Sequence, residues 1–331
     1  MLNRSRVTSG AESDGAQPDR HCSCSIVIPV YFNEGSLRGT LDALKSAVFV
    51  KHPDKAFEVV FVDDGSGDGS YTELLALHHE NADLVRVVKL TRNFGQVNAV
   101  VAGMYHARGE CTVTLSADGQ DPPDLINDML MAYTTEGFQI AIASRASREE
   151  SQFRVLTSRL FYTLMQKLAF PQMPVGGFDF VLLGPKAKKA FMENVEAHMF
   201  FQGQILWTGF PFKRFEYVRR ERTAGRSRWT LGRKVTYFID GILSHSYVPL
   251  RCMSVLGIGV AMVGFLYALV VIGNKLFWGN AVQGWTPLMV VLLVLGGVQM
   301  LMLGIIGEYL WRTLAQARNR TPFVVESVST R

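Results

Sequence analysis

The segment from Val59 to Gly69 reads VVFVDDGSGDG, so that four apolar residues run directly into two aspartates and a glycine-rich turn. A run of β-branched and aromatic residues predicts a strand that is buried on both faces. A helical pattern follows at once, from Ser70 to Glu80. This order is typical of a parallel α/β sheet, in which ligands bind beyond the carboxyl ends of the strands.

The same alternation continues on both sides of this segment. Apolar runs predict strands at Ser25–Val30, Phe57–Val62, Val85–Leu90, Cys111–Leu115 and Gln139–Ala143. The patterns between them predict helices at Glu34–Phe49, Ser70–Glu80, Val97–Arg108 and Pro123–Glu136. Strands separated by helices imply βαβ crossovers. We therefore expect a doubly wound α/β domain with a mostly parallel sheet over residues 23–230.

Two uncharged runs follow in the last third of the chain, from Met253 to Gly273 and from Pro287 to Gly307. As a helix, each is long enough to cross a hydrocarbon core of ~30 Å. A buried core helix can also be apolar all round, but two such runs in succession favour a transmembrane hairpin. We place this hairpin at residues 251–311.

Basic residues flank the predicted hairpin, whereas its connecting loop carries a single cation, Lys275. The basic residues are Arg226, Arg228, Arg233, Lys234 and Arg251 before the hairpin, and Arg312, Arg318 and Arg320 after it. Since cytoplasmic flanks of membrane spans are enriched in Lys and Arg, the catalytic domain and both termini are expected in the cytoplasm. The prediction is a multi-pass protein of the cell (inner) membrane.

The remaining segments are assigned from composition. Residues 1–22 are polar and lack the apolar stretch of a secretory signal, which predicts a disordered tail. Residues 231–250 alternate apolar and polar positions at helical spacing, as a juxtamembrane amphipathic helix would, although an ordinary packed helix has the same pattern. Residues 312–331 are expected to form a basic cytoplasmic tail.

Several function classes are excluded by missing motifs. The first strand-to-helix turn, PVYFNE from Pro29 to Glu34, has no GxGxxG, and no GxxxxGK[ST] occurs in the chain. The four cysteines, Cys22, Cys24, Cys111 and Cys252, show no zinc-ligand spacing. The net charge of +5 comes without a nucleic-acid-binding motif. Dinucleotide oxidoreductases, P-loop enzymes, zinc proteins and nucleic-acid partners are thereby disfavoured.

Polar residues follow each predicted strand and are the candidates for a site. They are Asn33 and Glu34, Asp63 and Asp64, Arg92 and Asn93, Asp118 and Gln120, and Ser144 and Arg145. The acidic turn after Val62 has a plainer interpretation, a turn with a capping aspartate. The carboxylate of Asp118 and the amide of Gln120 could share one hard cation, because Mg²⁺ needs only one or two protein carboxylates beside substrate phosphates.

The motifs PVYFNE, VDDGS, TRNFG, SADGQDPP, GGFDF and RTAGRSRW occur in this order before the apolar runs. Together they resemble the family 2 GT-A glycosyltransferases that act on polyprenyl phosphates, over about residues 25 to 311. In layout the chain is similar to dolichyl-phosphate mannose synthases, bacterial polyprenyl-phosphate glucosyltransferases and undecaprenyl-phosphate formamido-arabinose transferases. The resemblance implies inverting transfer of a sugar from a nucleotide diphosphate donor to undecaprenyl or dolichyl phosphate at the cytoplasmic membrane face. The product would be a lipid-linked sugar for the cell envelope.

The resemblance also implies roles for individual residues. Donor binding would involve Pro29, Glu34, Asp63, Asp64, Arg92, Asn93 and Asp118, and Mg²⁺ or Mn²⁺ would be held by Asp118 and Gln120. Asp179 would lie beside the acceptor, whose phosphate would meet Arg222, Ser227 and Arg228. Asp179, Arg222 and Arg228 form the expected catalytic set. A capping role for Asp179 and a solvated basic face for the arginines are the structural alternatives.

The chain departs from the family pattern at two places and leaves other functions open. Ser116 stands where the family usually has the first acid of DxDxQ, and PVYFNE is one residue longer than the usual motif. A polysaccharide synthase would need Gln at Gly225 to complete its QxxRW signature. A weakly active sugar-nucleotide-binding scaffold on the membrane is favoured only by Ser116. The oligomeric state stays open between a monomer and a homo-oligomer.

Overall fold

The structure is a computed structural model that describes residues 23–145, 163, 166–167, 170–174, 177–196, 199–218, 241, 246, 248–278, 285–318 and 320–329. The chain divides into two compact units. The first unit contains residues 1–240 together with 321–331, and the second contains residues 241–320. The first unit therefore contains the α/β region together with the C-terminal end of the chain, and the second contains the apolar region.

The first unit is built on an eight-stranded mixed sheet with the order β7-β5-β6-β4-β1-β2-β3-β8. The strands are β1 (Cys24–Val30), β2 (Phe57–Asp63), β3 (Val85–Leu90), β4 (Cys111–Thr114), β5 (Ile140–Arg145), β6 (Phe180–Leu183), β7 (Phe212–Tyr217) and β8 (Val325–Val328). The central strands β4, β1, β2 and β3 are parallel, as the alternating pattern predicts. Strand β6 runs antiparallel between β4 and β5, which makes the sheet mixed.

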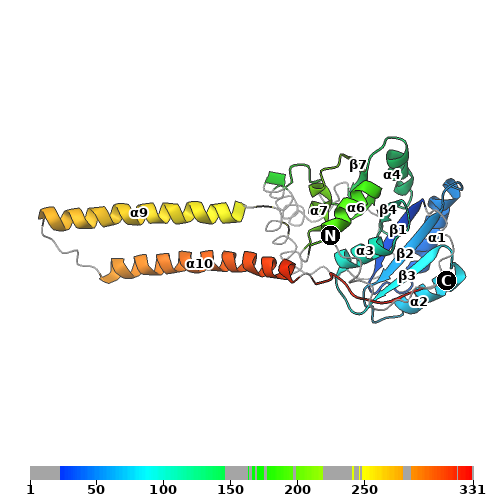
Figure 1. The fold of residues 1–331 in the computed structure, drawn as a ribbon, viewed down its shortest axis with the longest axis horizontal. Coiled ribbons are helices and arrows are strands. Elements are labelled where there is room, and N and C mark those ends of the chain that lie inside the picture. The colour runs from blue at the N-terminus through cyan, green and yellow to red at the C-terminus, as the bar shows by residue number, and fades with distance from the viewer. Residues whose placement is uncertain are drawn as a thin grey trace. The chain divides into compact units, whose positions relative to one another are not determined.

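Helices cover both faces of this sheet, which confirms the doubly wound architecture (Figure 1). The helices are α1 (Leu37–Ala47), α2 (Ser70–Glu80), α3 (Gln96–His106), α4 (Leu125–Thr134), α6 (Pro185–Glu193) and α7 (Phe201–Trp207), with a short 3₁₀ turn at Phe49–Lys51. Helices α1, α2 and α4 contribute to one continuous apolar core. Helix α3 packs on β1, β2 and β3, and it also contacts α6.

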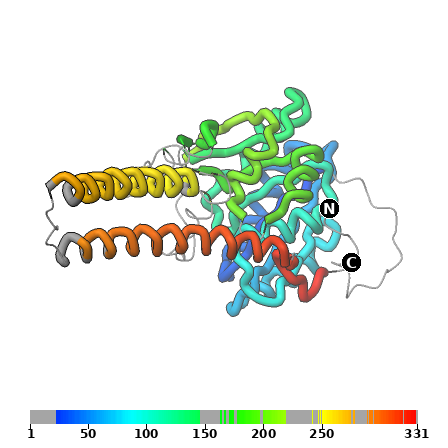
Figure 2. The backbone as a smooth tube through the Cα atoms, turned by 60° about the vertical axis from the view of Figure 1, so that its left-hand side comes forward, coloured from blue at the N-terminus to red at the C-terminus, as the bar shows by residue number. Residues whose placement is uncertain are grey.

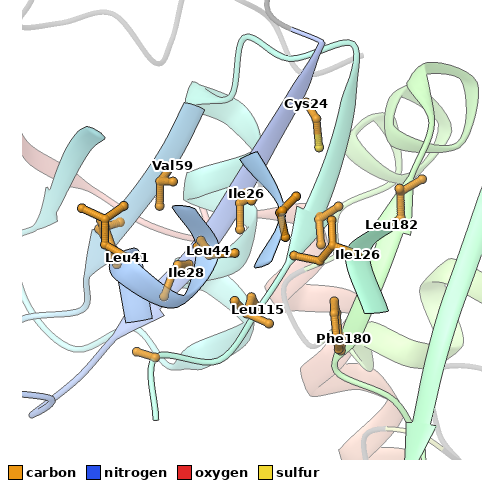
Figure 3. Packing of buried hydrophobic residues seen from close by; sticks show 14 of the residues in the cluster. Cys24, Ile26, Ile28, Leu41, Leu44, Val59, Leu115, Ile126, Phe180 and Leu182 are labelled. Carbon is orange, nitrogen blue, oxygen red and sulfur yellow. The ribbon is translucent and has the colours of Figure 1, made fainter. Parts of the chain in front are cut away.

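The core explains why the central strands are apolar throughout. Ile26 and Ile28 of β1 are fully buried against Leu41 and Leu44 of α1, as Figure 3 shows. The intervening Val27 is equally buried, and its side chain is aimed at the opposite face because successive strand residues alternate. With both faces covered, these strands are buried along their length, and polar residues are found where the strands end.

Strand β8 was not expected from the sequence. The predicted basic tail at 312–331 instead continues α10 as far as Ala317 and then forms a strand at Val325–Val328. This strand pairs antiparallel with β3. An exposed strand edge carries unpaired N–H and C=O groups, so β8 completes a sheet that would otherwise end at β3.

The second unit consists of two long helices, α9 (Val248–Trp278) and α10 (Trp285–Ala317), which lie side by side (Figures 1 and 2). Leu250–Gly273 and Val290–Ala317 are long and apolar enough to cross a membrane, and neither window is buried inside the protein. The expected pair of apolar helices is confirmed. The predicted amphipathic helix at 231–250 falls mostly outside the described residues.

Candidate functional site

The candidate site lies at one edge of the sheet. Parallel strands end at the same edge, so the loops after β1, β2, β3 and β4 meet there. Strands β5 and β7 run in the same direction as β4, because β6 is antiparallel to both β4 and β5. Asp179, directly before β6, therefore lies at this edge together with Arg145 and Tyr217, which end β5 and β7.

The loop after β1 is fastened to the loop after β2. A Glu34 carboxylate oxygen accepts a hydrogen bond from the Gly69 N–H at 3.0 Å, and the Asn33 N–H donates to the Ser70 hydroxyl at 2.9 Å. Pro29 lies half-buried within β1, opposite Val62 of β2. The structure thus brings the predicted donor-binding residues Pro29 and Glu34 to the β1–β2 side of the site.

Asp64 connects the loop after β2 to the loop after β3. Its two carboxylate oxygens accept hydrogen bonds from the backbone N–H groups of Phe94, at 2.7 Å, and Gly95, at 3.0 Å. Burial raises the pKa of Asp64 to about 6, although the two N–H groups act in the opposite direction. The loop from Arg92 to Gly95 is therefore shaped around the Asp64 carboxylate.

The close approach of these two loops depends on Gly65. Its φ is +70°, and a Cβ at this position would lie 2.6 Å from the carbonyl carbon of Arg92 and 2.7 Å from the nitrogen of Asn93. Any larger residue would push the loops apart. The glycine in VDDGS is thus required both by the turn itself and by the loop that Arg92 and Asn93 form.

Asp63 and Arg92 complete this side of the site. One Asp63 oxygen accepts the Ser66 N–H at 3.2 Å, and the other is buried without a partner among the described residues. Burial raises the pKa of Asp63. The exposed Arg92 side chain has its guanidinium 4.0 Å from the centre of the Phe94 ring, and the guanidinium donates a hydrogen bond to the Asn93 carbonyl at 3.1 Å. A buried carboxylate oxygen without a partner is costly, and a polar ligand would relieve that cost.

A second group of oxygen atoms follows β4. The Ser116 hydroxyl lies 2.9 Å from an Asp118 oxygen and 2.5 Å from an Asp121 oxygen. The Gln120 N–H donates to the same Asp118 oxygen at 3.2 Å. The side chains of Asp118, Gln120 and Asp121 are nearly buried, at 8%, 6% and 4% exposure. Ser116, which stands in the place of the usual acid, therefore lies within hydrogen-bond distance of both the Asp118 and the Asp121 carboxylates.

Asp121 is held from the far side by β7. The Tyr217 hydroxyl donates to the second Asp121 oxygen at 2.6 Å. Burial raises the pKa of Tyr217, and the Asp121 charge raises it further, so the phenol keeps its proton. For Arg145, burial favours the neutral form, but Asp179, Tyr217 and Asp121 outweigh this and raise its pKa. This corner of the site is a connected network of ionised and hydroxyl groups.

Asp179 lies at the open end of that network. Its side chain is 48% exposed and forms an ion pair with Arg145 at 3.4 Å. The Gln202 amide nitrogen approaches the other Asp179 oxygen at 3.5 Å, while the Gln202 amide oxygen is buried without a partner among the described residues. The Asp179 carbonyl accepts a short hydrogen bond from the Thr114 hydroxyl at 2.6 Å. Asp179 is thus anchored through its backbone and has an accessible carboxylate.

Sequence reasoning found some of these residues and missed others. Arg222, Ser227 and Arg228 lie outside the described residues. Asp121 stands in the quoted motif SADGQDPP, but only Asp118 and Gln120 were selected from it. Tyr217 and Gln202 were not selected at all, and they reach the site only through the register of β7 and the placement of α7. No local pattern around these two residues identifies them.

Comparison with known proteins places this arrangement in a family. The model of glycosyl transferase family 2 matches residues 25–191. An uncharacterised glycosyltransferase of Bacillus subtilis strain 168 is 35% identical over 93% of this chain and 94% of its own length. The prophage bactoprenol glucosyl transferase homolog of Escherichia coli strain K12 is 31% identical over 92% of this chain and 98% of its own length. The bactoprenol glucosyl transferase of Shigella phage SfV is also 31% identical, over 92% of this chain and 98% of its own length. The chain therefore belongs to glycosyl transferase family 2 and is a glycosyltransferase with a GT-A-like sheet domain.

Proposed function

We propose that this glycosyltransferase moves a sugar from a nucleoside diphosphate sugar to the phosphate of a polyprenyl lipid. One observation carries the proposal. The similarity to relatives named bactoprenol glucosyl transferase runs through 92% of this chain and 98% of theirs, and therefore includes the apolar helices as well as the sheet domain. A lipid acceptor gives those helices a role, since they would hold the site at the surface where the acceptor is found.

The helices also support the proposed location. α9 and α10 would cross the cell (inner) membrane as a hairpin, and the basic residues before and after them favour a cytoplasmic location for both flanks. The donor of this proposal, a nucleoside diphosphate sugar, is charged and water-soluble. A site that faces the cytoplasm would receive the donor from solution and the acceptor from the membrane.

The donor would bind along the loops after β1, β2 and β3. In this proposal Pro29, Glu34, Asp63 and Asp64 line the nucleoside pocket, with Arg92 and Asn93 beside it. One buried oxygen of Asp63 has no hydrogen-bond partner in the described part of the chain, which favours a ligand with a hydrogen-bond donor. Asp64 would contribute by shaping the loop that carries Arg92 and Asn93.

The oxygen atoms after β4 fit a divalent cation such as Mg²⁺ or Mn²⁺. Among the described residues no group of three or more His, Cys, Asp or Glu side chains could hold a metal by itself. Mg²⁺, however, is commonly bound by one or two carboxylates and substrate phosphates. Asp118 and Gln120 would hold the cation. The Ser116 and Asp118 oxygens are 2.9 Å apart, and adjacent ligands of an octahedral ion with 2.1 Å bonds are about 3.0 Å apart.

This spacing suggests a role for the serine that replaces the usual acid. A hydroxyl has one hydrogen, and the shorter contact of Ser116 is to Asp121. The lone pairs of Ser116 would then face Asp118, so that both oxygens could bind the same cation. The cation would offset negative charge on the diphosphate leaving group.

The chain's own residues would align the acceptor. A phosphate monoester with a second pKa of about 6 is largely a dianion at neutral pH, so it needs no strong base. Asp179, held by Arg145, would orient the acceptor rather than deprotonate it. Arg222, Ser227 and Arg228 would bind phosphate oxygens, a task that suits the planar arginine side chain. Direct displacement by the acceptor oxygen would invert the anomeric carbon.

The proposal is tested with the full-length protein in detergent or lipid, undecaprenyl phosphate, and a panel of UDP- and GDP-linked sugars that includes UDP-glucose. We expect one donor to yield a lipid-linked sugar by mass spectrometry, with an anomeric configuration opposite to that of the donor. Excess chelator should stop the reaction, and Mg²⁺ or Mn²⁺ should restore it. Release of free sugar without lipid-linked product from every donor would contradict the proposed acceptor.

A further inference from the structure

The C-terminal segment Phe323–Ser329 lies against the part of the sheet that carries the Arg92–Gly95 loop. In the ladder between β8 and β3, Val328 lies opposite Val88, Ser327 opposite Lys89, and Val325 opposite Leu90. The pairing continues past the end of β3, where the Thr91 N–H donates to the Val324 carbonyl at 3.1 Å. The last of these bonds is therefore one residue before Arg92.

Side chains add to this backbone ladder. Lys89 and Glu326 form an ion pair at 2.8 Å, and the hydroxyls of Tyr71 and Ser327 are 3.3 Å apart. The Val87 N–H donates to the Ser329 hydroxyl at 2.9 Å. Because the ion pair is partly exposed, it contributes little to stability, and the backbone bonds are the main attachment.

Phe323 provides the second attachment. Its side chain is only 8% exposed, and its ring meets the ring of Tyr105 at an angle of 61°, with 6.4 Å between the ring centres. Tyr105 lies near the carboxyl end of α3, and the first residue of this helix, Gln96, directly follows the loop. One segment therefore supports the strand that enters the Arg92–Gly95 loop and the helix that leaves it.

We propose that Phe323–Ser329 is a positioning element for the Arg92–Gly95 loop. Part of this inference rests on the proposed function, since the loop is there assigned to the donor. The Phe94 and Gly95 N–H groups bind Asp64 at 2.7 and 3.0 Å, so a shift of the loop by about 1 Å would break these hydrogen bonds. The segment follows α10 after only a few residues, and it therefore links the end of an apolar helix to the donor loop through the chain.

The test compares two full-length variants in which a partly or fully buried aromatic ring is removed. Phe323→Ala removes the ring beside α3. Phe49→Ala, the control, removes a ring stacked on Phe57, at the amino end of β2 and thus far from the site edge. Both changes should lower thermal stability. Only Phe323→Ala should speed amide hydrogen exchange in residues 91–95, by about 10-fold relative to β4, because local opening is then easier.

Activity gives a second measurement. With UDP-glucose as the donor probe, Phe323→Ala should raise the donor KM by about 10-fold and change kcat and the acceptor KM by less than about 3-fold, as expected for loss of ground-state binding. A second variant, Ser329→Ala, removes one hydrogen bond to Val87 and should show the same pattern at about 3-fold. This milder change decides the inference if Phe323→Ala does not fold.

The two hypotheses fail in different ways. Equal exchange rates in residues 91–95 for the Phe323→Ala and Phe49→Ala variants would overturn the positioning role, whatever the protein transfers. Faster exchange in the Phe323→Ala variant, together with no lipid-linked product from the wild type with any donor of the panel, would support the positioning role and contradict the proposed acceptor. Faster exchange together with an unchanged donor KM would show that the loop does not bind the donor, and would overturn the functional part of the inference.

Discussion

Two buried aspartates at the same sheet edge, Asp64 and Asp118, are held in different ways. Asp64 is bound by backbone N–H groups of the next loop in the sequence. Asp118 accepts one backbone N–H, from Gln120 in its own loop, and otherwise belongs to a series of side-chain contacts through Ser116, Asp121 and Tyr217. Contacts to backbone N–H groups require one particular conformation of the loop that carries them. Side-chain contacts can be altered one atom at a time, so the Asp118 region is the easier one to dissect by mutation.

The largest effect is expected for Asp118→Ala. If Asp118 acts on the reacting diphosphate, its loss should lower kcat by on the order of 10³-fold, comparable to the loss of a strong electrostatic contact in a transition state. Steady-state transfer to undecaprenyl phosphate measures this. Asp124→Ala is a suitable control, because Asp124 is exposed and pairs with Lys51 on the surface. A similar loss in both variants would remove Asp118 from the reaction.

A smaller effect of another kind is expected for Asp64→Asn. The neutral amide has one acceptor oxygen where the carboxylate has two, so one of the Phe94 and Gly95 N–H groups loses its acceptor and the other keeps only an uncharged one. A hydrogen bond to a charged group is worth about 1.5–3 kcal/mol, which corresponds to about 10- to 150-fold. This should be seen in the donor KM more than in kcat. If kcat falls and the donor KM does not change, Asp64 acts in catalysis, and its role does not differ from that proposed for Asp118.

Tyr217→Phe tests the side-chain network itself. The change removes the hydroxyl bound to Asp121 and leaves the ring, so kcat should fall by about 10-fold with little change in donor KM. Tyr133→Phe is the matched control, since the Tyr133 hydroxyl donates to Glu110 at 2.6 Å, outside the site. If the two variants behave alike, the bond between Tyr217 and Asp121 has only a structural role.

Ser116→Cys asks whether the serine touches the cation. Thiolates favour soft metals, so a direct ligand should shift the ratio of Cd²⁺ to Mn²⁺ affinity by about five-fold or more towards Cd²⁺. Calorimetric titration of the full-length protein with each metal measures the ratio. Ser36→Cys serves as the control, because the Ser36 hydroxyl lies 3.1 Å from the Ala117 carbonyl but is not among the proposed ligands. An unchanged ratio in Ser116→Cys would leave Asp118 and Gln120 as the only protein ligands.

The smallest expected effect is on the pH dependence of stability. The pKa of Asp64 is about 6 in the folded protein and ordinarily 3.8, so the fold binds a proton between these values that the unfolded chain does not. The stabilisation of the folded state by this proton is complete below pH 3.8 and is lost as the pH rises through 6. The melting temperature of the wild type relative to Asp64→Asn should therefore rise by a few degrees from pH 7 to pH 5. A constant difference would show that Asp64 has an ordinary pKa.

The sequence predicts the centre of the fold well because the signals there are local. β1 to β4 are apolar strands between helices. Asp63 ends β2, Asp64 follows it directly, and Asp118 lies a few residues after β4, all in recognisable motifs. β7 reads FKRFEY, in which charged residues interrupt the apolar pattern, and β8 comes after two long apolar helices. Neither strand has a strong signal of its own, and both form because neighbouring strands offer an edge.

The partners in the site are harder to predict for the same reason. Tyr217 meets Asp121 across 96 positions in the sequence, and Gln202 meets Asp179 across 23. Both contacts depend on how β7 and α7 are placed against the sheet. A one-residue shift in the register of β7 would turn Tyr217 to the other face. Single-sequence patterns do not contain this information.

Strand β8 has a consequence for how the protein is made. Its partner β3 leaves the ribosome early, whereas β8 follows both apolar helices, so the sheet cannot be completed until those helices have been synthesised. At typical synthesis rates this delay is on the order of tens of seconds. During that time the β3 edge is open to pairing with other chains. Both α9 and α10 must therefore be synthesised before β8 can protect the β3 edge from pairing with other chains.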